Sequence, residues 1–464
     1  MKRPALPYQL PAIEYAAGTR HPALFLEMRL GKTLVAIRAV KEWKSARVLV
    51  LAPLSVLASW EYELGQEGEG AASFPESSQL DLEVPPPGGR TWTLVNFERL
   101  LAAFKAGDAD KFTEWAGQFD AVIVDESTRI KNPKAMTTKL ICTAFQGAAH
   151  RMILSGLPAP EGPADYVEQF RFLHGRFMGC RNFWTFRAAY FEMLPHAFEW
   201  TPKRGAREAI KEEVHRLAYI LSRQEAGIGS QKIYTRRYVY PTREQERHTE
   251  QIEGEWSFGD EETQNALVRH TWLARVAGGH GPGDGWPVVS DRKAKEIVTL
   301  LRGELSGQSV LVLFRFNTEL ELTRRILSKA GIPCVTITGE TTTEDRKARR
   351  LQIQSGAVRV ALLQIKVCRY GLDFSKASTA IYYSNSYSVE DRKQSEDRII
   401  HPQKSEPLLY IDLITTESID ETVSEAVRMK YSDSKFFLRK LIEMEGKRLA
   451  EKYRGRKNKG LHKP

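Results

Sequence analysis

Cysteine is rare in this sequence. The chain has only four cysteines, which lie far apart and form no CxxC pair: Cys142, Cys180, Cys334 and Cys368. Zinc sites and disulfide frameworks use closely spaced or numerous cysteines, so this pattern argues against both. It fits the reducing environment of a cytoplasm.

Long apolar runs are also missing. No stretch of eighteen or more apolar residues occurs, so we expect no membrane span. The amino terminus, MKRPALPYQL, is basic but lacks the long apolar core of a signal peptide. We find neither an internal repeat nor a heptad pattern. A hydrophobic content of 42% with 27% charged residues is that of a soluble globular protein.

Acidic residues are outnumbered by basic ones. The chain has 58 Asp and Glu against 68 Lys and Arg, which gives a net charge of +10 and a pI of about 9.2. A basic balance favours a polyanionic partner, nucleic acid above all, although a solvated surface without a partner gives the same signature.

Short apolar segments recur in two regions of the 464-residue chain, which is too long for one ordinary core. Continuous runs of Val, Ile and Leu suit strands that are buried on both faces of a parallel sheet. They lie at 47–53, 91–97, 119–125 and 150–155, and then at 309–314, 333–338, 358–363, 379–384 and 408–414. Helix-like segments alternate with them. The pattern predicts an α/β fold with two doubly wound parallel-sheet lobes.

The middle of the chain differs in composition. Residues 168–200 interleave aromatic with basic residues, 204–275 look mostly helical, and 277–287 are a Gly/Pro-rich hinge or linker. We therefore expect a first lobe at 1–170, a helical insertion with a linker at 171–288, a second lobe at 289–430, and a C-terminal helix with a basic tail at 431–464.

The aromatic residues of this middle segment have two interpretations. They are Phe170, Phe172, Phe183, Trp184, Phe186, Tyr190 and Phe191. Such residues commonly pack a helical insertion. Alternatively, they stack on unpaired bases, as in proteins that bind single strands.

A candidate phosphate-binding loop lies near the amino terminus, at LEMRLGKTL (26–34). The tripeptide Gly31-Lys32-Thr33 follows a short apolar stretch and opens a helix, which is the context that a P-loop requires. Leu26 replaces the usual first glycine, and Arg29 stands where a small residue is expected. The helix start would bind phosphate, Lys32 would contact the β and γ oxygens of ATP, and Thr33 would bind Mg²⁺.

A carboxylate pair completes this chemistry. Asp125 and Glu126 end a run of apolar residues, and carboxylates at the tip of a buried strand are costly unless a cation is near. Asp125 would hold Mg²⁺, and Glu126 would orient the attacking water. Solvated acids at an ordinary strand end are the alternative; the upstream Gly-Lys-Thr favours the catalytic interpretation.

Nine motifs in order resemble those of the Swi/Snf-type superfamily-two helicases, of the compact kind found in bacteria and phages. RPALPYQ (3–9) resembles the adenine-reading Q motif and LEMRLGKT motif I. LVLAPLSVLASW (49–60) and TLVNFERL (93–100) resemble motifs Ia and Ib, VDESTRIKNP (124–133) motif II, and LSGLPAP (154–160) motif III. VLVLFRF (310–316), YGLDFSKAS (370–378) and QSEDRIIHPQ (394–403) resemble motifs IV, V and VI.

The resemblance implies two RecA-like lobes with ATP between them, and a bacterial or phage-infected cytoplasm as the location. It implies that Gln9 contacts adenine, that Arg398 reaches the γ-phosphate, and that Leu30, Gly31, Gly371 and Asp373 help to bind the nucleotide. It also implies duplex DNA as the partner. Ser55, Asn96 and Ser375 follow strands, where hydroxyl and amide groups can bind phosphates without reading sequence.

Two departures from the family pattern affect catalysis. His401 stands where the family usually has a second arginine, the finger that neutralises transition-state charge. Arg398 itself, Arg392 or Lys404 are candidate substitutes. Cys368 and Arg369 replace glycines that are common in motif V, and would add strain if that turn needs a positive φ.

We therefore expect an ATP-dependent translocase on duplex DNA with slow turnover. A strand-separating DNA or RNA helicase is one alternative. A nucleic-acid clamp that binds ATP and hydrolyses it weakly is another, suggested by His401 and the altered motif V.

Overall fold

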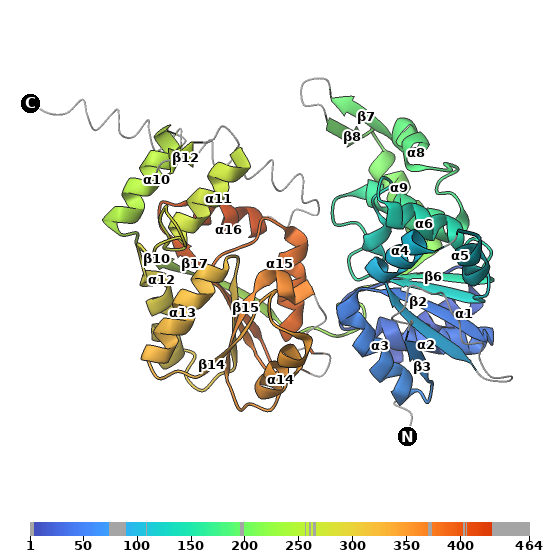
Figure 1. Cartoon of the computed structure of the whole chain (residues 1–464), viewed down its shortest axis with the longest axis horizontal. Helices are drawn as coiled ribbons and strands as arrows, with labels where there is room; N and C mark the ends of the chain where they lie inside the picture. Colours follow the sequence, from blue (N-terminus) through green and yellow to red (C-terminus); the bar gives the residue numbers. More distant parts are fainter. Residues whose placement is uncertain are drawn as a thin grey trace, which may run out of the picture. The chain divides into compact units, whose positions relative to one another are not determined.

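The computed structural model describes residues 4–428, except 74–89, 108, 195–198, 256, 259–260, 263–265, 370–373, 402–403 and 405. The chain divides into two compact units, Met1–Ile228 and Gly229–Pro464, here called the N-terminal and C-terminal units. Each is built around one parallel sheet with helices on both faces (Figure 1).

The N-terminal unit has a seven-stranded parallel sheet. The strands run, in spatial order, β3 (Ala71–Ser73), β4 (Thr91–Asn96), β2 (Arg47–Ala52), β5 (Ala121–Asp125), β6 (His150–Leu154), β1 (Ala23–Leu26) and β9 (Ala218–Leu221). The helices are η1 (Pro7–Gln9), α1 (Leu10–Gly18), α2 (Lys32–Trp43), α3 (Leu54–Gln66), α4 (Phe97–Ala106), α5 (Ala109–Ala116), η2 (Ser127–Ile130), α6 (Met136–Ala144), η3 (Pro163–Asp165), α7 (Tyr166–His174), α8 (Phe183–Tyr190) and α9 (Ala206–Leu217). A separate antiparallel hairpin consists of β7 (Phe191–Leu194) and β8 (Glu199–Pro202).

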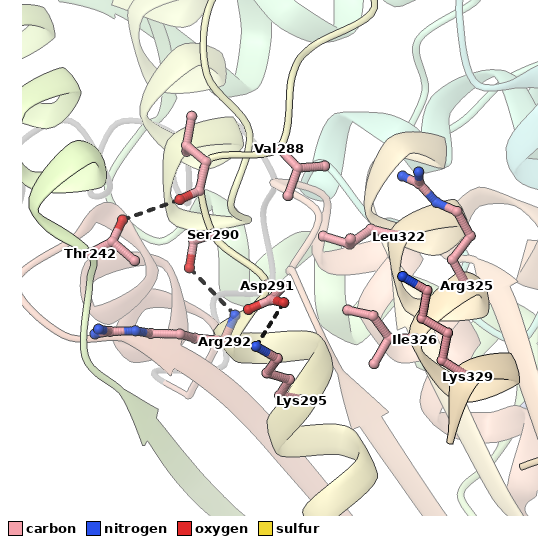
Figure 2. Close-up of a pocket in the computed structure, with 11 residues that line it drawn as sticks. Thr242, Val288, Ser290, Asp291, Arg292, Lys295, Leu322, Arg325, Ile326 and Lys329 are labelled. Atoms are coloured by element: carbon pink, nitrogen blue, oxygen red, sulfur yellow. Dashed lines mark hydrogen bonds and ion pairs between the residues drawn. The ribbon is translucent and has the colours of Figure 1, made fainter. Parts of the chain in front are cut away.

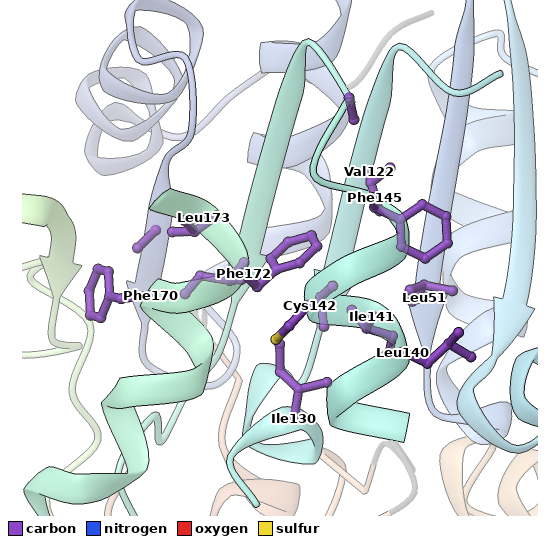
Figure 3. Packing of buried hydrophobic residues seen from close by; sticks show 14 of the residues in the cluster. Leu51, Val122, Ile130, Leu140, Ile141, Cys142, Phe145, Phe170, Phe172 and Leu173 are labelled. Carbon is purple, nitrogen blue, oxygen red and sulfur yellow. The ribbon is translucent and has the colours of Figure 1, made fainter. Parts of the chain in front are cut away.

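Two hydrophobic clusters cover the two faces of this sheet, because successive strand residues point to opposite sides. Leu49 and Leu51 of β2 enter one cluster, and Val48 and Val50 enter the other. Figure 3 shows the first cluster, where α6 and α7 pack on the sheet through side chains such as Phe145, Phe172 and Leu173.

The C-terminal unit has a six-stranded parallel sheet in the order β10 (Lys232–Val239), β17 (Leu408–Thr415), β16 (Thr379–Tyr382), β13 (Val310–Phe314), β15 (Val360–Gln364) and β14 (Cys334–Ile337). Its helices are α10 (Arg243–Glu255), α11 (Ala266–Ala277), α12 (Arg292–Arg302), α13 (Asn317–Lys329), α14 (Thr343–Gln354), η4 (Ile365–Arg369), α15 (Val389–Glu396), η5 (Asp397–Ile399) and α16 (Ile419–Arg428). A short hairpin joins β11 (Ser257–Phe258) to β12 (Glu261–Glu262).

The expected fold class, two parallel-sheet α/β lobes, is confirmed, and all nine apolar segments are strands. The domain boundaries differ from those expected. Part of the region 171–288 belongs to each unit, because β9 completes the first sheet and β10 the second. Of the described helices, none is both long and apolar enough to cross a membrane.

The Gly/Pro-rich segment 277–287 is also not a loose linker. It lies inside the C-terminal unit, where Gly281 N donates to Pro287 O at 2.8 Å and Val289 N donates to Gly279 O at 2.9 Å. Gly279 has a φ of 94°, and a Cβ there would lie 2.2 Å from Ser290 O. The glycine content thus serves a tight turn. The expected C-terminal helix and tail at 431–464 lie outside the described residues.

Candidate functional site

The loop between β1 and α2 has the backbone of an anion-binding turn. Arg29 and Gly31 have φ values of 73° and 77°, both in the left-handed region. Gly31 is the residue that precedes the first turn of α2, and Lys32 and Thr33 begin the helix. A non-glycine residue at position 29 therefore takes the conformation that the loop needs, at a cost of roughly 1–2 kcal/mol.

Gln9 supports this loop from a distant part of the chain. Its Nε2 donates to Leu30 O at 2.9 Å, and its Oε1 accepts from Leu6 N at 2.9 Å. The side chain is 1% exposed and packs so closely that a Cβ on Gly31 would lie 2.3 Å from Nε2. The residue expected to contact adenine is thus part of the loop's own structure. Each polar group of its amide still has one hydrogen-bonding position for a ligand.

Lys32 points back over the loop that precedes it. Its Nζ donates to Leu26 O at 3.1 Å. Motif III lies against it, because a Cβ on Gly156 would approach Lys32 Nζ to 3.2 Å and Met28 Cγ to 3.0 Å. Glycine at position 156 therefore leaves room for the ammonium group.

Asp125 lies at the end of β5 and is almost completely buried, with 4% of its surface exposed. Trp60 Nε1 donates to its Oδ2 at 2.8 Å, and Glu126 N donates to its Oδ1 at 2.8 Å. Burial raises the pKa of this carboxyl, and the Lys32 ammonium acts in the opposite direction. The structure thus brings Lys32 and Asp125 into one electrostatic site, as the sequence predicts.

The donor set fits a divalent cation. A buried carboxylate whose pKa is raised by desolvation gains most from an added positive charge, and hard cations such as Mg²⁺ take oxygen ligands. Asp125 supplies such an oxygen, and the Thr33 hydroxyl on α2 is a second candidate. Among the described residues, no cluster of three or more His, Cys, Asp or Glu forms another metal site.

Motifs II and III are joined by a buried glutamine that the sequence patterns do not indicate. Ser127 Oγ donates to Gln169 Oε1 at 2.6 Å, and Gln169 Nε2 donates to Pro158 O at 2.7 Å. Gln169 is fully buried on α7. Glu126, the expected water-orienting residue, precedes Ser127 and has a left-handed φ of 48°. The network therefore restrains the strand end that carries both carboxylates.

In the C-terminal unit, Arg398 is a buried residue of η5 that donates through Nε to Cys368 O. Phe374 N donates in return to Arg398 O at 3.1 Å, so motifs V and VI are held together. The suspected strain at motif V is not found. Cys368 and Arg369 end η4, and neither is among the described residues with positive φ. Gly371 and Asp373 lie outside the described residues.

The other two candidate substitutes for a second arginine, Arg392 and Lys404, have structural roles. Arg392 is buried, donates to Asp412 Oδ1 at 2.6 Å and to Glu396 Oε1 at 2.8 Å, and lies over the Tyr382 ring. Lys404 Nζ donates to Ser375 O at 3.0 Å and to Ala377 O at 2.8 Å. Both cations stabilise the unit internally, as Arg398 does through its Nε.

The expected phosphate contacts lie at a strand end (Asn96), in a helix (Ser55) and in a loop (Ser375). Asn96 is the last residue of β4 and caps α4, because its Oδ1 accepts from Arg99 N at 2.7 Å. Only its amide nitrogen is left for a phosphate. Ser55 lies in the first turn of α3, and Ser375 is a half-buried residue whose carbonyl accepts from Lys404.

The aromatic segment is mainly core, as the packing interpretation predicts. Phe170, Phe172, Phe186 and Phe191 are buried in the first hydrophobic cluster, and Phe183 and Tyr190 pack against it. Trp184 is the exception, with 45% of its surface exposed.

A separate pocket of about 530 Å³ lies in the C-terminal unit between α12 and α13 (Figure 2). Its lining includes Arg292, Lys295, Arg325 and Lys329 around Leu322 and Ile326. None of the predicted site residues lines it.

Comparisons with known proteins agree with the motifs. Residues 99–237 match the SNF2-related domain, and residues 292–402 match the helicase conserved C-terminal domain. These two matched segments lie in different compact units, the first mainly in the N-terminal unit and the second in the C-terminal unit.

Curated relatives are distant. The SWI/SNF-related matrix-associated actin-dependent regulator of chromatin subfamily A-like protein 1 of Drosophila melanogaster is 22% identical over 320 residues, which cover 68% of this chain and 40% of that protein. The Caenorhabditis elegans homolog is 21% identical, over 91% of this chain and 60% of that protein. The chain thus spans about half the length of these relatives. A solved Sulfolobus solfataricus SWI2/SNF2 ATPase core in complex with dsDNA is 20% identical, with 95% and 97% of the two chains covered and a TM-score of 0.44.

Proposed function

We propose that this chain, which carries an SNF2-related domain and a helicase conserved C-terminal domain, is an ATP-dependent translocase that moves on duplex DNA. The observation that carries the proposal is the convergence of Lys32, Gly31 and Asp125 at one edge of the N-terminal sheet. The carboxyl ends of β1 and β5 lie at this edge with β6 between them, because parallel strands end at the same edge.

Each residue of the site has a chemical role in the proposal. The backbone of Leu30 and Gly31 and the Lys32 ammonium bind phosphate oxygens, and Gln9 contacts adenine. Thr33 and Asp125 would hold Mg²⁺, which would supply charge neutralisation at the phosphates. Glu126 orients the attacking water by accepting its hydrogen bond, and Arg398 neutralises charge on the leaving γ-phosphate.

The proposed nucleic-acid contact is independent of sequence. A net charge of +10 favours a polyanion, and the candidate contacts Ser55, Asn96 and Ser375 offer groups that suit phosphates rather than base edges. Affinity for duplex DNA should therefore fall steeply as salt rises. An affinity that is insensitive to salt would contradict phosphate-dominated binding.

ATPase rates with duplex DNA, single-stranded DNA, RNA and no nucleic acid test the proposal directly. We expect the highest rate with duplex DNA. Lys32→Ala should lower this rate about 10²–10³-fold through loss of charge stabilisation. Lys44→Ala, an exposed lysine just after the same helix, is the matched control and should retain the rate.

Two alternatives are separated by further measurements. A translocase displaces the third strand of a triplex without separating a tailed duplex, whereas duplex unwinding would identify a helicase. His401, which stands in place of a second arginine, favours a clamp that hydrolyses ATP only weakly. DNA binding that depends on nucleotide, without ATP turnover stimulated by DNA, would establish the clamp.

Origin and location belong to the proposal as well. We propose that the chain is of the compact kind found in bacteria and phages and that it acts in the cytoplasm. The scattered cysteines support a reducing compartment, while the curated relatives named above are eukaryotic.

A further inference from the structure

A surface on α8 and the β7–β8 hairpin displays two tryptophans that the core does not use. Trp184 on α8 is 45% exposed and Trp200 on β8 is 37% exposed. Phe186, on the opposite side of the same helix, is fully buried. Tryptophan is usually well buried, so two such neighbours at the surface of one supersecondary unit need an explanation other than packing. Figure 1 shows α8 and the hairpin beside one another at one end of the N-terminal unit.

Arg187 lies over the rings of both tryptophans. Its guanidinium carbon is 4.2 Å from the ring centroid of Trp200 and 4.7 Å from that of Trp184. These cation–π contacts hold the guanidinium against both rings. Within the described part of the chain, no carboxylate or carbonyl accepts a hydrogen bond from the Arg187 side chain. The N–H edge of this cation is therefore available to an anionic ligand.

The surroundings are basic. Residues 176–207 contain six Lys and Arg but only Glu192 and Glu199 as acids. Lys134 adds a further cation, 5.8 Å from the ring centroid of Trp184. A ligand that satisfies this surface carries negative charge and flat apolar groups together. Nucleotides with unpaired bases have both, since their phosphates pair with the cations and their bases stack on the indoles.

We propose that Trp184, Arg187 and Trp200 form a binding surface for unpaired nucleotides of single-stranded DNA. Paired bases in a duplex are stacked on one another and present only their edges, so this surface selects single-stranded segments over duplex DNA. The inference rests on the proposed function only in taking DNA as the nucleic acid. It adds a second contact, which favours substrates where a duplex meets a single strand.

The test compares full-length variants in binding to three fluorescent probes: a twenty-nucleotide oligo-dT, a blunt twenty-base-pair duplex, and an acidic peptide of poly-Glu. Trp184→Ala and Trp200→Ala should each weaken oligo-dT binding about 5- to 150-fold, the range for loss of one stacked base. Duplex binding should change less than about twofold. Trp184→Phe should restore part of the loss, because a smaller ring still stacks.

Arg187→Lys keeps the charge but loses the flat guanidinium, so it should also weaken oligo-dT binding. Tyr240→Ala removes an exposed aromatic residue of the C-terminal unit and is the matched control. Unchanged thermal unfolding of the variants establishes that the fold is intact. Equal losses for oligo-dT and duplex, no loss for either, or tryptophan-dependent binding of poly-Glu in place of oligo-dT would each overturn the inference.

The same variants separate this inference from the proposed function. Duplex-stimulated ATP hydrolysis should persist in Trp184→Ala. If the wild-type protein shows no duplex-stimulated hydrolysis yet binds oligo-dT through Trp184, the proposed translocase fails and the surface stands. If duplex DNA stimulates hydrolysis and Trp184→Ala leaves oligo-dT binding unchanged, the proposed translocase stands and the proposed binding surface fails.

Discussion

Gln9 Nε2 and Gly31 are in such close contact that a Cβ on residue 31 would lie 2.3 Å from the amide nitrogen. The same nitrogen donates to Leu30 O at 2.9 Å. A residue near the amino terminus therefore supports the phosphate-binding loop, and a Cβ at residue 31 would force the Gln9 amide to move. The φ of 77° at Gly31 also favours glycine through the backbone.

Gly31→Ala should weaken ATP binding at least about tenfold, since the new methyl displaces Gln9 and strains the backbone. Binding of a fluorescent ATP analogue measures this. Gln9→Ala removes the steric conflict but not the backbone strain, so the double variant should bind better than the sum of the two single effects implies. Strict additivity would show that the contact is unimportant.

Trp60→Phe should raise the Mg²⁺ concentration needed for ATP hydrolysis. Without the indole N–H, the pKa of Asp125 rises further, so protons compete better with the metal and the effect grows as pH falls. Magnesium titrations at several pH values measure it.

Trp92→Phe is the control for the Trp60 variant. Trp92 is equally buried in the same unit, and its Nε1 donates to Glu69 at 3.0 Å rather than to the site. Both variants should lose about 0.5–3 kcal/mol of unfolding free energy, but only Trp60→Phe should change the Mg²⁺ requirement. Equal Mg²⁺ requirements in both variants would remove the proposed role of the indole.

Gln169→Leu should lower kcat for ATP hydrolysis with little change in KM, because it frees motif II from motif III without touching the phosphate loop. Ser127→Ala breaks one end of the same connection. The pair should show a coupling free energy of about 0.5–3 kcal/mol.

Gln146→Leu controls for the loss of a glutamine hydrogen bond in the same unit, at an exposed position. Gln146 Nε2 donates to Cys142 O at 2.8 Å, away from both motifs. Its kcat should stay close to that of the wild type. A similar fall in kcat for Gln146→Leu would show that Gln169 only stabilises the fold and has no specific effect on catalysis.

Glu319 should make the stability of the C-terminal unit dependent on pH. It is fully buried on α13, and burial raises its pKa from 4.5 to about 7, opposed by the hydrogen bond from Ser384 and the charge of Lys293. A raised pKa means that the folded state favours the protonated form. The contribution of Glu319 to the unfolding free energy is fully present below pH 4.5 and is lost as pH rises through about 7.

Glu319→Gln does not titrate, so its unfolding free energy relative to wild type should increase by up to about 3 kcal/mol over this pH range. Urea unfolding at a series of pH values measures the difference. Glu321→Gln, at an exposed glutamate of the same helix, is the control. A difference between Glu319→Gln and wild type that stays constant with pH would show that Glu319 does not titrate in this range.

His401→Arg should increase the DNA-stimulated kcat, because an arginine finger contributes about 10³–10⁵-fold where it is present. An increase of tenfold or more is expected. His401→Lys provides the charge without the fork of N–H donors and should gain less. No gain in either variant would show that Arg398 already supplies the needed charge.

The sequence alone determined the elements with strong local signals. Continuous runs such as residues 121–124 and 310–314 are strands because burial on both sheet faces leaves no polar position in them. Lys32 with Thr33, and Asp125 with Glu126, were recognisable as pairs because each follows a strand. β9 and β10 were missed, since both are edge strands and β10 is largely half-exposed, so neither has a continuous apolar pattern.

Only the tertiary structure decided which distant side chains complete the site. Trp60 and Gln169 are unremarkable in sequence, and they reach Asp125 and Ser127 because α3 and α7 pack near the tip of β5. The boundary between the two compact units, between residues 228 and 229, likewise depends on which sheet β9 and β10 join. Local patterns report the burial of a segment, whereas hydrogen bonds between segments far apart in the chain depend on how the elements pack.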